Sequence, residues 1–248
     1  MTPYSKFRFS CSRDVACFTR CCKDVNIFLT PYDVLRMKGS LGITSGEFLK
    51  RYTKTLLSGG SSLPVVLLRL DDDNDKSCLF LTPGGCRIYA DRPWSCRMYP
   101  LDRASDEDDE FTLIVDGTFC FGLNEKKEWV VEDWFIDQGL VDYDTMNQSF
   151  VDVAGAEHTW KDRVPGRSVI DMFYMTCYDI DRFRDFVFTS DFLNLFEVDP
   201  LIKGLIAKDD LELLKFGFKW LRFGLFGDRT MTVKKEALES KRRGKQRP

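Results

Sequence analysis

Histidine is nearly absent from this sequence, which contains a single one, His158, in 248 residues. Zinc sites built on histidine, iron sites with two histidines and a carboxylate, and most Ser–His or Cys–His nucleophile pairs are therefore excluded, unless His158 is itself the partner. The surrounding stretch GAEHTWKDRVPG is typical of a surface loop. We therefore look for the chemistry of this chain in other side chains.

Long apolar runs are also lacking. No segment approaches the roughly 20 residues of a membrane span, and the opening MTPYSKFRFSCSR has no apolar core of a secretory signal. The sequence thus predicts a cytoplasmic protein with no membrane partner. Because the cytoplasm is reducing, cysteines there are expected to bind metal or do redox chemistry rather than form disulfides.

Paired Cys-x2-Cys knuckles, which the commonest zinc ribbons use, do not occur in the chain. Cysteine itself is plentiful, with nine residues, an odd number that also argues against a disulfide framework. Eight of them precede residue 121 and stand beside turn or loop residues: Cys11, Cys17, Cys21, Cys22, Cys78, Cys86, Cys96 and Cys120. The ninth, Cys177, lies in the apolar segment VIDMFYMTCYDI and is predicted to fill the core.

The charge is unevenly distributed. The chain carries −3 in all, but residues 229–248 alone carry +6, so the rest carries −9. An acidic body repels phosphates, so no nucleic-acid partner is expected, and the basic tail is predicted to be a disordered terminus. Another protein is the kind of partner that the sequence still allows. The sequence does not define the oligomeric state.

The hydrophobic pattern predicts an α+β fold: a cysteine-rich metal-binding module of short helices and hairpins over 1–125, packed against a helical region over 126–228, with the tail at 229–248. Thr30 before Pro31, and Thr44 with Glu47, mark the starts of two helices in the module. Cys78 and Cys86 are placed on the arms of one hairpin around a Pro-Gly-Gly turn. Later helices are expected near 127–137, 143–153, 181–196 and 209–223, with their aromatic side chains in the core.

Thiolates are soft ligands that select zinc or iron–sulfur clusters, and each such site takes four protein ligands. Eight cysteines could fill two sites, or one site with four thiols left over. The spacing Cys17-x3-Cys21 suits one helical turn with both thiols on one face, whereas Cys22 points about 100° away. Adjacent cysteines therefore favour a cluster with several iron corners, or two neighbouring sites.

The cysteine spacing and its surroundings resemble a known family. The string C-x5-C-x3-C-C, then NIFLTPYDVLRMK, then CLFLTPGGCRIYADRPWSCRMYP and a later cysteine are similar to the YkgJ-type cysteine-cluster family, a zinc- or iron-chelating domain. Many members begin with shorter Cys-x2-Cys-type spacing, so Cys11 departs from the pattern. The module also occurs in flagellin lysine N-methylases, for which the resemblance implies an iron–sulfur cluster and an S-adenosylmethionine donor.

The favoured interpretation is a metal-binding protein whose eight cysteines hold a 4Fe–4S cluster, with zinc as the other metal. The alternatives are an S-adenosylmethionine-dependent lysine methylase, although no Gly-rich nucleotide loop is recognisable, and a structural zinc adaptor. Catalytic residues are not identified. Arg92 and Arg97, in the Arg-Pro-x2-Cys-Arg-x-Tyr-Pro box, are predicted either to bind next to the centre and offset thiolate charge, or to pair with Asp91 or Asp102.

Overall fold

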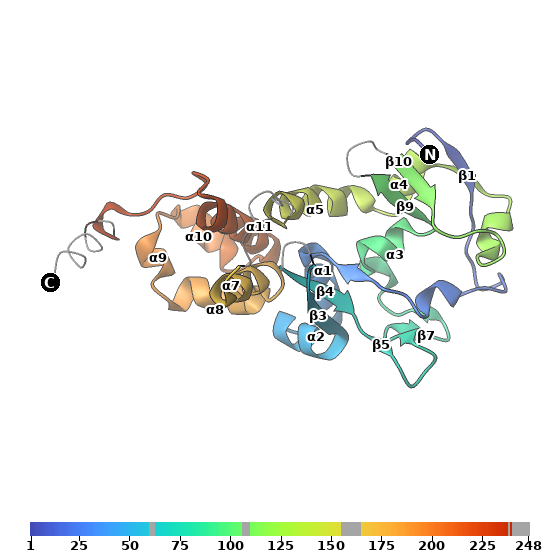
Figure 1. The fold of residues 1–248 in the computed structure, drawn as a ribbon, viewed down its shortest axis with the longest axis horizontal. Coiled ribbons are helices and arrows are strands. Elements are labelled where there is room, and N and C mark those ends of the chain that lie inside the picture. The colour runs from blue at the N-terminus through green and yellow to red at the C-terminus, as the bar shows by residue number, and fades with distance from the viewer. Residues whose placement is uncertain (60–62, 106–109, 155–164, 238, 240–248) are drawn as a thin grey trace. The chain divides into compact units, whose positions relative to one another are not determined.

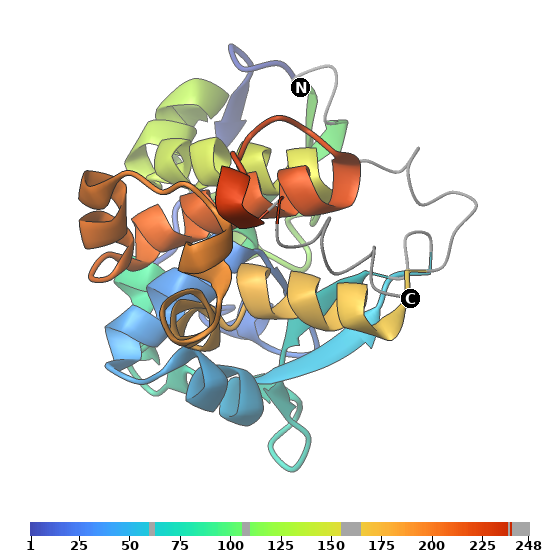
Figure 2. The same ribbon diagram turned by 90° about the vertical axis from the view of Figure 1, so that its left-hand side faces the viewer.

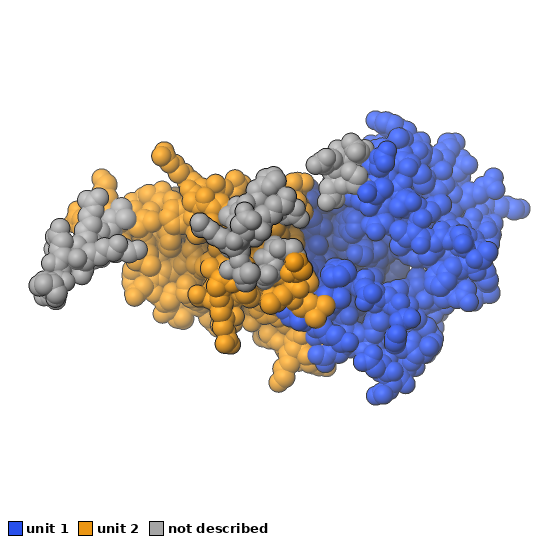
Figure 3. All heavy atoms as spheres, in the orientation of Figure 1, with its two compact units in different colours: residues 1–41, 52–55, 66–147 blue, residues 42–51, 56–65, 148–248 orange. Residues whose placement is uncertain are grey.

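The computed structural model describes residues 1–59, 63–105, 110–154, 165–237 and 239, and these ranges divide into two compact units (Figure 3). Unit 1 comprises Met1–Leu41, Tyr52–Thr55 and Val66–Asn147, and unit 2 comprises Gly42–Arg51, Leu56–Val65 and Gln148–Pro248. The predicted segments 1–125, 126–228 and 229–248 stay predictions. His158 lies outside the described residues.

The helices are short in the first half of the chain and dominate the second half (Figure 1). They are α1 (Pro31–Leu41), α2 (Ser45–Tyr52), α3 (Trp94–Met98), α4 (Val131–Asp137), α5 (Leu140–Ala154), α7 (Arg167–Cys177), α8 (Ile180–Thr189), α9 (Phe192–Leu195), α10 (Pro200–Ile206) and α11 (Asp210–Leu221). Single 3-10 turns occur at Arg20–Cys22, Tyr89–Asp91 and Phe121–Asn124, and a π-helical turn follows α11 at Arg222–Phe226.

The strands are two to five residues long and form small antiparallel pairings. They are β1 (Lys6–Arg8), β2 (Phe28–Leu29), β3 (Thr53–Leu57), β4 (Pro64–Leu68), β5 (Leu70–Asp71), β6 (Ser77–Cys78), β7 (Leu81–Thr82), β8 (Gly85–Cys86), β9 (Leu101–Ser105), β10 (Glu110–Leu113) and β11 (Glu128–Val130). The pairs are β1–β11, β9–β10, β5–β6 and β7–β8, and β4 lies between β2 and β3 in the one three-stranded sheet among the described residues. The predicted α+β class, with a helical second half, is confirmed.

Two helix starts follow from capping residues that the sequence displays. The Thr30 hydroxyl accepts from the Asp33 N–H at 3.2 Å, and the Thr44 hydroxyl accepts from the Glu47 N–H at 3.2 Å. Each cap satisfies a backbone donor that the first turn of a helix leaves free. Gly42 follows α1 with a φ of +63°, a conformation that glycine adopts without steric cost and that ends the helix.

The core of unit 1 is an aromatic and aliphatic cluster that includes one of the eight candidate thiols. Its buried members are Phe7, Phe9, Met98, Leu101, Phe111, Cys120, Val131, Trp134 and Leu140. The Trp134 ring meets Phe7 and Phe9 edge-on, at centroid distances of 5.9 Å and 5.3 Å. The cluster therefore fixes the β1–β11 ribbon relative to α3 and α4.

The second half of the chain, in yellow to red, is a set of helices (Figure 2). Aromatic side chains on α8, α9 and α11 hold unit 2 together. The Trp220 ring stacks on Phe183 at 5.6 Å and meets Phe192 edge-on at 5.3 Å. Cys177, at the end of α7, is 1% exposed, which confirms its predicted place in the core. No helix among the described residues is long and apolar enough to cross a bilayer.

Four predicted elements are wrong in detail. Cys17 and Cys21 do not share a helical turn, because Thr19 between them has a φ of +69°, which a right-handed helix does not allow. Cys78 and Cys86 lie on two successive pairings, β5–β6 and β7–β8, rather than on one hairpin. The segment 127–137 begins as strand β11, and 181–196 is split into α8 and α9 at Ser190, whose backbone is extended.

The beginning of the basic tail has defined structure. Val233 forms a bridge with Phe196, and the Lys234 ammonium donates to the Leu193 carbonyl at 2.8 Å. Residues 240–248, which carry most of the positive charge of the tail, lie outside the described residues. The predicted disorder of the tail as a whole stays a prediction.

Candidate metal centre

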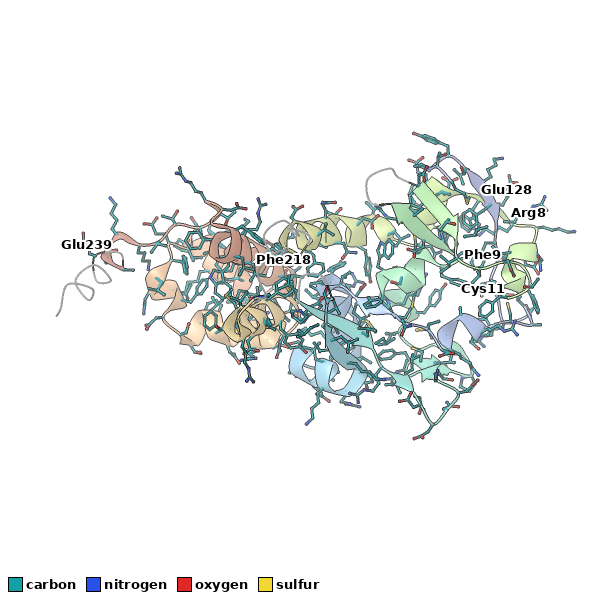
Figure 4. The ribbon with its side chains drawn as sticks, in the orientation of Figure 1. Arg8, Phe9, Cys11, Glu128, Phe218 and Glu239 are labelled. Carbon is teal, nitrogen blue, oxygen red and sulfur yellow. The ribbon has the colours of Figure 1, made fainter. Side chains whose placement is uncertain are left out.

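All eight candidate ligands belong to unit 1, although they come from six separate places along the chain. Cys11 lies on the segment after β1 and is exposed, near Phe9 in Figure 4. Cys21 and Cys22 lie in the 3-10 turn at Arg20–Cys22, and Cys17 comes three residues before that turn. The others end β6 (Cys78) and β8 (Cys86), lie within α3 (Cys96), and precede the turn at Phe121–Asn124 (Cys120).

Backbone hydrogen bonds bring the segments of Cys11, Cys17 and Cys120 together. The Phe121 N–H donates to the Cys17 sulfur at 3.2 Å, although the two residues are 104 positions apart. The Ser10 N–H, next to Cys11, donates to the Gly122 carbonyl at 3.0 Å. These bonds place Cys11 and Cys17 beside the chain that carries Cys120.

Tyr99 adds a hydroxyl to this neighbourhood. Burial raises the pKa of Tyr99, and its hydrogen bond to the Cys120 sulfur raises it further. The Tyr99 hydroxyl thus contacts the Cys120 side chain and helps to position it. Sequence reasoning missed this role, although Tyr99 stands in the Arg-Pro-x2-Cys-Arg-x-Tyr-Pro box.

A second set of contacts joins the segments of Cys22 and Cys78. Lys23 and Ser77 form an antiparallel bridge, and the Asp24 N–H donates to the Lys76 carbonyl at 3.0 Å. In an antiparallel pairing, the residue before one partner lies opposite the residue after the other. Cys22 and Cys78 are therefore placed opposite each other by the backbone alone.

The segments of Cys78 and Cys86 are also linked, and both sulfurs accept backbone hydrogen bonds. The Arg87 N–H donates to the Phe80 carbonyl at 3.0 Å. Burial raises the pKa of Cys78 to about 11, against a hydrogen bond from the Phe80 N–H that lowers it. Burial likewise raises the pKa of Cys86, against a hydrogen bond from the Ile88 N–H. Such N–H donors stabilise thiolate ligands in metal and iron–sulfur sites.

Cys96 is close enough to this second neighbourhood to interact with it electrostatically. Burial is the main cause of its strongly raised pKa, and the charges of Cys78, Cys22 and Cys86 raise it further. These charges add to the effect of burial because like charges in a partly buried place repel one another. A bound cation removes that repulsion, because it supplies the positive charge that the thiolates lack.

Cys21 and Cys22 share a side-chain hydrogen bond. This bond lowers the pKa of Cys22 to about 7 and raises that of Cys21, because Cys21 donates its proton to the Cys22 sulfur. After the hydrogen bond and burial, the charges of Cys22, Cys11 and Cys96 add to the raised pKa of Cys21. The adjacent pair is therefore the point where the two neighbourhoods meet.

Within the part of the chain that the structure describes, no three His, Cys, Asp or Glu side chains are gathered closely enough to form a coordination shell as they stand. Coordination of one ion therefore requires the thiols of a neighbourhood to approach one another further. The donor chemistry itself fits a thiophilic metal, since the Cys17, Cys78, Cys86 and Cys120 sulfurs each accept a hydrogen bond from an N–H or O–H group.

The two predicted arginines bind backbone carbonyls rather than carboxylates. Arg97 is buried, donates through Nε to the Arg92 carbonyl at 3.0 Å and through Nη1 to the Gln138 carbonyl at 2.6 Å. Arg92 donates to the Tyr89 carbonyl at 2.7 Å and to the Gln138 side chain. The predicted pairing with Asp91 or Asp102 is not observed among the described residues, and Asp91 instead accepts from Arg36 at 3.0 Å.

Of these two arginines, Arg92 interacts electrostatically with the thiols, as Arg87 does with Cys78 and Cys86. Burial lowers the pKa of Arg92, whereas the charges of Cys96 and Cys86 act in the opposite direction. Arg92 is thus near enough to the second neighbourhood to offset thiolate charge, in line with one of its two predicted roles. Arg97 holds the loop before Cys96 in place through its three backbone acceptors, of which the third is the Ala90 carbonyl.

Asp33 is a buried positioning residue that the sequence interpretation missed. Its carboxylate accepts from the Thr30 N–H at 2.7 Å, the Thr30 hydroxyl at 2.9 Å and the Trp94 N–H at 2.8 Å. Burial raises its pKa to about 6 despite these donors. The capping-box spacing Thr30-x2-Asp33 was a readable signal, but its contact with α3, which carries Cys96, was not.

A surface cavity of about 480 Å³ opens beside the first neighbourhood. It is lined by the Cys17 residue, by the aromatic rings of Phe18, Phe119 and Phe121, and by charged residues that include Arg20. Arg20 lies over the Phe119 ring at 5.2 Å and donates to the Phe119 carbonyl at 3.2 Å. The cavity therefore offers solutes access to the Cys17 side of the thiols.

Comparison with known proteins gives one result for this region. Residues 10–121 match the CxxCxxCC family, which is described as a putative zinc- or iron-chelating domain, and the match includes all eight candidate ligands. Curated proteins and solved structures yield no match.

Proposed function

Because residues 10–121 match the zinc- or iron-chelating CxxCxxCC family, we propose that the clustered cysteines of this region hold iron and sulfide in a centre of the 4Fe–4S type. The observation that carries the proposal is the gathering of eight thiols in unit 1, with hydrogen-bond donors directed at four of the sulfurs. Partial burial raises the pKa of thiols such as Cys78 and Cys96, and a thiophilic metal supplies the positive charge that stabilises their thiolate form.

Two features favour iron–sulfur over zinc. Cys21 and Cys22 are adjacent in the sequence, a spacing that suits several metal corners better than one tetrahedral ion, and the knuckle spacing of common zinc ribbons is missing. N–H donors to sulfur are also a means by which proteins tune the potential of such clusters. A cytoplasmic location belongs to the proposal, since the thiols must stay reduced. The methylase alternative stays a prediction of the resemblance.

Anaerobic purification of the full chain, followed by metal and acid-labile sulfide analysis, tests this proposal. We expect iron and sulfide in equal amounts and a broad visible absorption that dithionite bleaches. The Cys177→Ser variant is the matched control, because it removes a thiol from unit 2 and should leave the metal and sulfide content unchanged. Colourless protein with stoichiometric zinc and no sulfide would overturn the iron–sulfur assignment, and a chain free of metal after reconstitution would overturn the metal centre.

A further inference from the structure

The Arg20–Cys22 turn lies between two parts of the chain that carry other cysteines. On one side, Arg20 donates to the Phe119 carbonyl at 3.2 Å, which is adjacent to Cys120. On the other side, Lys23 is bridged to Ser77, which is adjacent to Cys78. The turn is therefore in contact with both neighbourhoods through backbone and side-chain bonds that do not involve the thiols themselves.

The two cysteines of the turn are next to different parts of the chain, although their thiols share a hydrogen bond. Cys22 precedes Lys23, and the bridge from Lys23 to Ser77 sets Cys22 opposite Cys78. Cys21 follows Arg20, whose guanidinium donates to the Phe119 carbonyl beside Cys120. One thiol of the adjacent pair is thus available to each side.

We propose that the eight cysteines form two separate four-thiolate centres, with the adjacent pair divided between them. The first thiol set is Cys11, Cys17, Cys21 and Cys120, and the second thiol set is Cys22, Cys78, Cys86 and Cys96. The inference rests on the proposed metal-binding function and adds to it the number of centres and the ligands of each.

The contacts within each set come from independent elements. In the first set, the Phe121 N–H bond to Cys17 and the Ser10 N–H bond to Gly122 join three cysteine-bearing segments. In the second set, the Lys23–Ser77 bridge and the bond from Arg87 to Phe80 join another three. The fourth segment, α3 with Cys96, is tied to the chain after Cys86 by the bond from the Arg97 guanidinium to the Ala90 carbonyl. Four thiolates complete the protein ligands of either a zinc ion or a 4Fe–4S cluster, so the division leaves none over.

Single substitutions in the full chain test the division. Cys120→Ser is expected to remove the first centre and Cys86→Ser the second, so each variant should keep about half of the wild-type metal, and the double variant should keep none. Cys21→Ser and Cys22→Ser should likewise each lose about half, although the residues are adjacent. Cys177→Ser should keep all of it. Loss of all metal in both Cys120→Ser and Cys86→Ser would overturn the division.

Thiol protection gives a second readout that separates this inference from the proposed function and from misfolding. Anaerobic alkylation of the folded protein, read by peptide mass spectrometry, should modify only the remaining second-set thiols in Cys86→Ser and only the remaining first-set thiols in Cys120→Ser. Equal modification of both sets in either variant contradicts two centres. If the wild-type chain binds metal but each variant loses all thiol protection, the proposed function stands and the division is refuted. If the wild-type chain binds no metal, both are refuted.

Discussion

At the scale of single residues, the cysteine region depends on buried polar groups that compensate one another. Asp33 has no exposed surface, yet it carries a carboxylate with three hydrogen-bond donors from Thr30 and Trp94. Buried charges are retained where donors satisfy them, and removal of a donor leaves the full desolvation cost. The carboxylate therefore fixes the start of α1 against the start of α3, which in turn positions Cys96.

The raised pKa of Asp33 predicts a pH dependence of stability. Its pKa is about 6 in the folded chain against an ordinary value of 3.8, so the unfolded chain loses the proton first as the pH rises. The contribution of Asp33 to the free energy of unfolding is thus full below pH 4 and falls by on the order of 3 kcal/mol as the pH passes through 6. Urea unfolding of wild type and Asp33→Asn at several pH values measures this contribution to the free energy of unfolding.

Acid also releases thiolate-bound metal from both proteins. The effect of Asp33 is therefore the difference between the free energies of unfolding of wild type and Asp33→Asn at each pH. We expect the wild-type value minus the variant value to fall between pH 4 and pH 6 and to be level above it. A difference that stays constant across this window would show that Asp33 titrates near its ordinary pKa.

At the scale of elements, the cysteines stand on pieces too short to be stable alone. β6 and β8 have two residues each, and Cys21 and Cys22 stand on a single 3-10 turn. Such pieces gain order only from contacts with other segments. The close approach of Gly122 to the chain before Cys11 is one such contact, because a Cβ at this position would lie 2.8 Å from the Ser10 carbonyl and 3.1 Å from the Phe9 ring.

Gly122→Ala is therefore expected to separate the Cys11 and Cys120 segments and to lower the free energy of unfolding by about 1–3 kcal/mol, the usual cost of overpacking. Gly39→Ala is the matched control in the same unit, since a Cβ at Gly39 in α1 meets nothing within 4 Å. It should raise helix stability by about 0.5–1 kcal/mol. Thermal unfolding with parallel metal analysis distinguishes the two, and equal stability of both variants would contradict the close contact.

At the scale of the whole molecule, the two units differ in what stabilises them. Unit 2 has long amphipathic helices whose aromatic side chains, such as Trp220 and Phe183, pack on one another. Unit 1 also has an aromatic core, but its cysteine-bearing turns are short and carry thiols that are mostly half-buried. Metal binding to such segments contributes directly to their folding free energy.

Removal of the metal should therefore affect the chain unevenly. We expect a strong chelator to increase amide hydrogen exchange in peptides that cover the Arg20–Cys22 turn and the β5–β8 region, and to leave α11 protected. Exchange mass spectrometry of the same protein before and after chelation measures both at once. Equal loss of protection in α11 would show that the metal stabilises the whole chain rather than the cysteine region.

The sequence could predict those features that depend on neighbouring residues. The caps at Thr30 and Thr44, the amphipathic helices of the second half and the burial of Cys177 follow from local pattern, and each is confirmed. The helical turn expected from Cys17 to Cys21 is wrong, because a backbone reversal at Thr19 is not encoded in the spacing of the thiols.

What the sequence by itself determined is the chemistry: eight thiols, one histidine and a charge balance that leave soft-metal ligation as the use of this region. The tertiary structure alone decided which thiols are neighbours, since Cys17 meets the chain at Phe121 across 104 positions, and Cys22 meets Cys78 across a bridge between distant strands. The physical reason is that ligand identity is a property of each side chain, whereas ligand grouping depends on long-range backbone hydrogen bonds and core packing that no local spacing specifies.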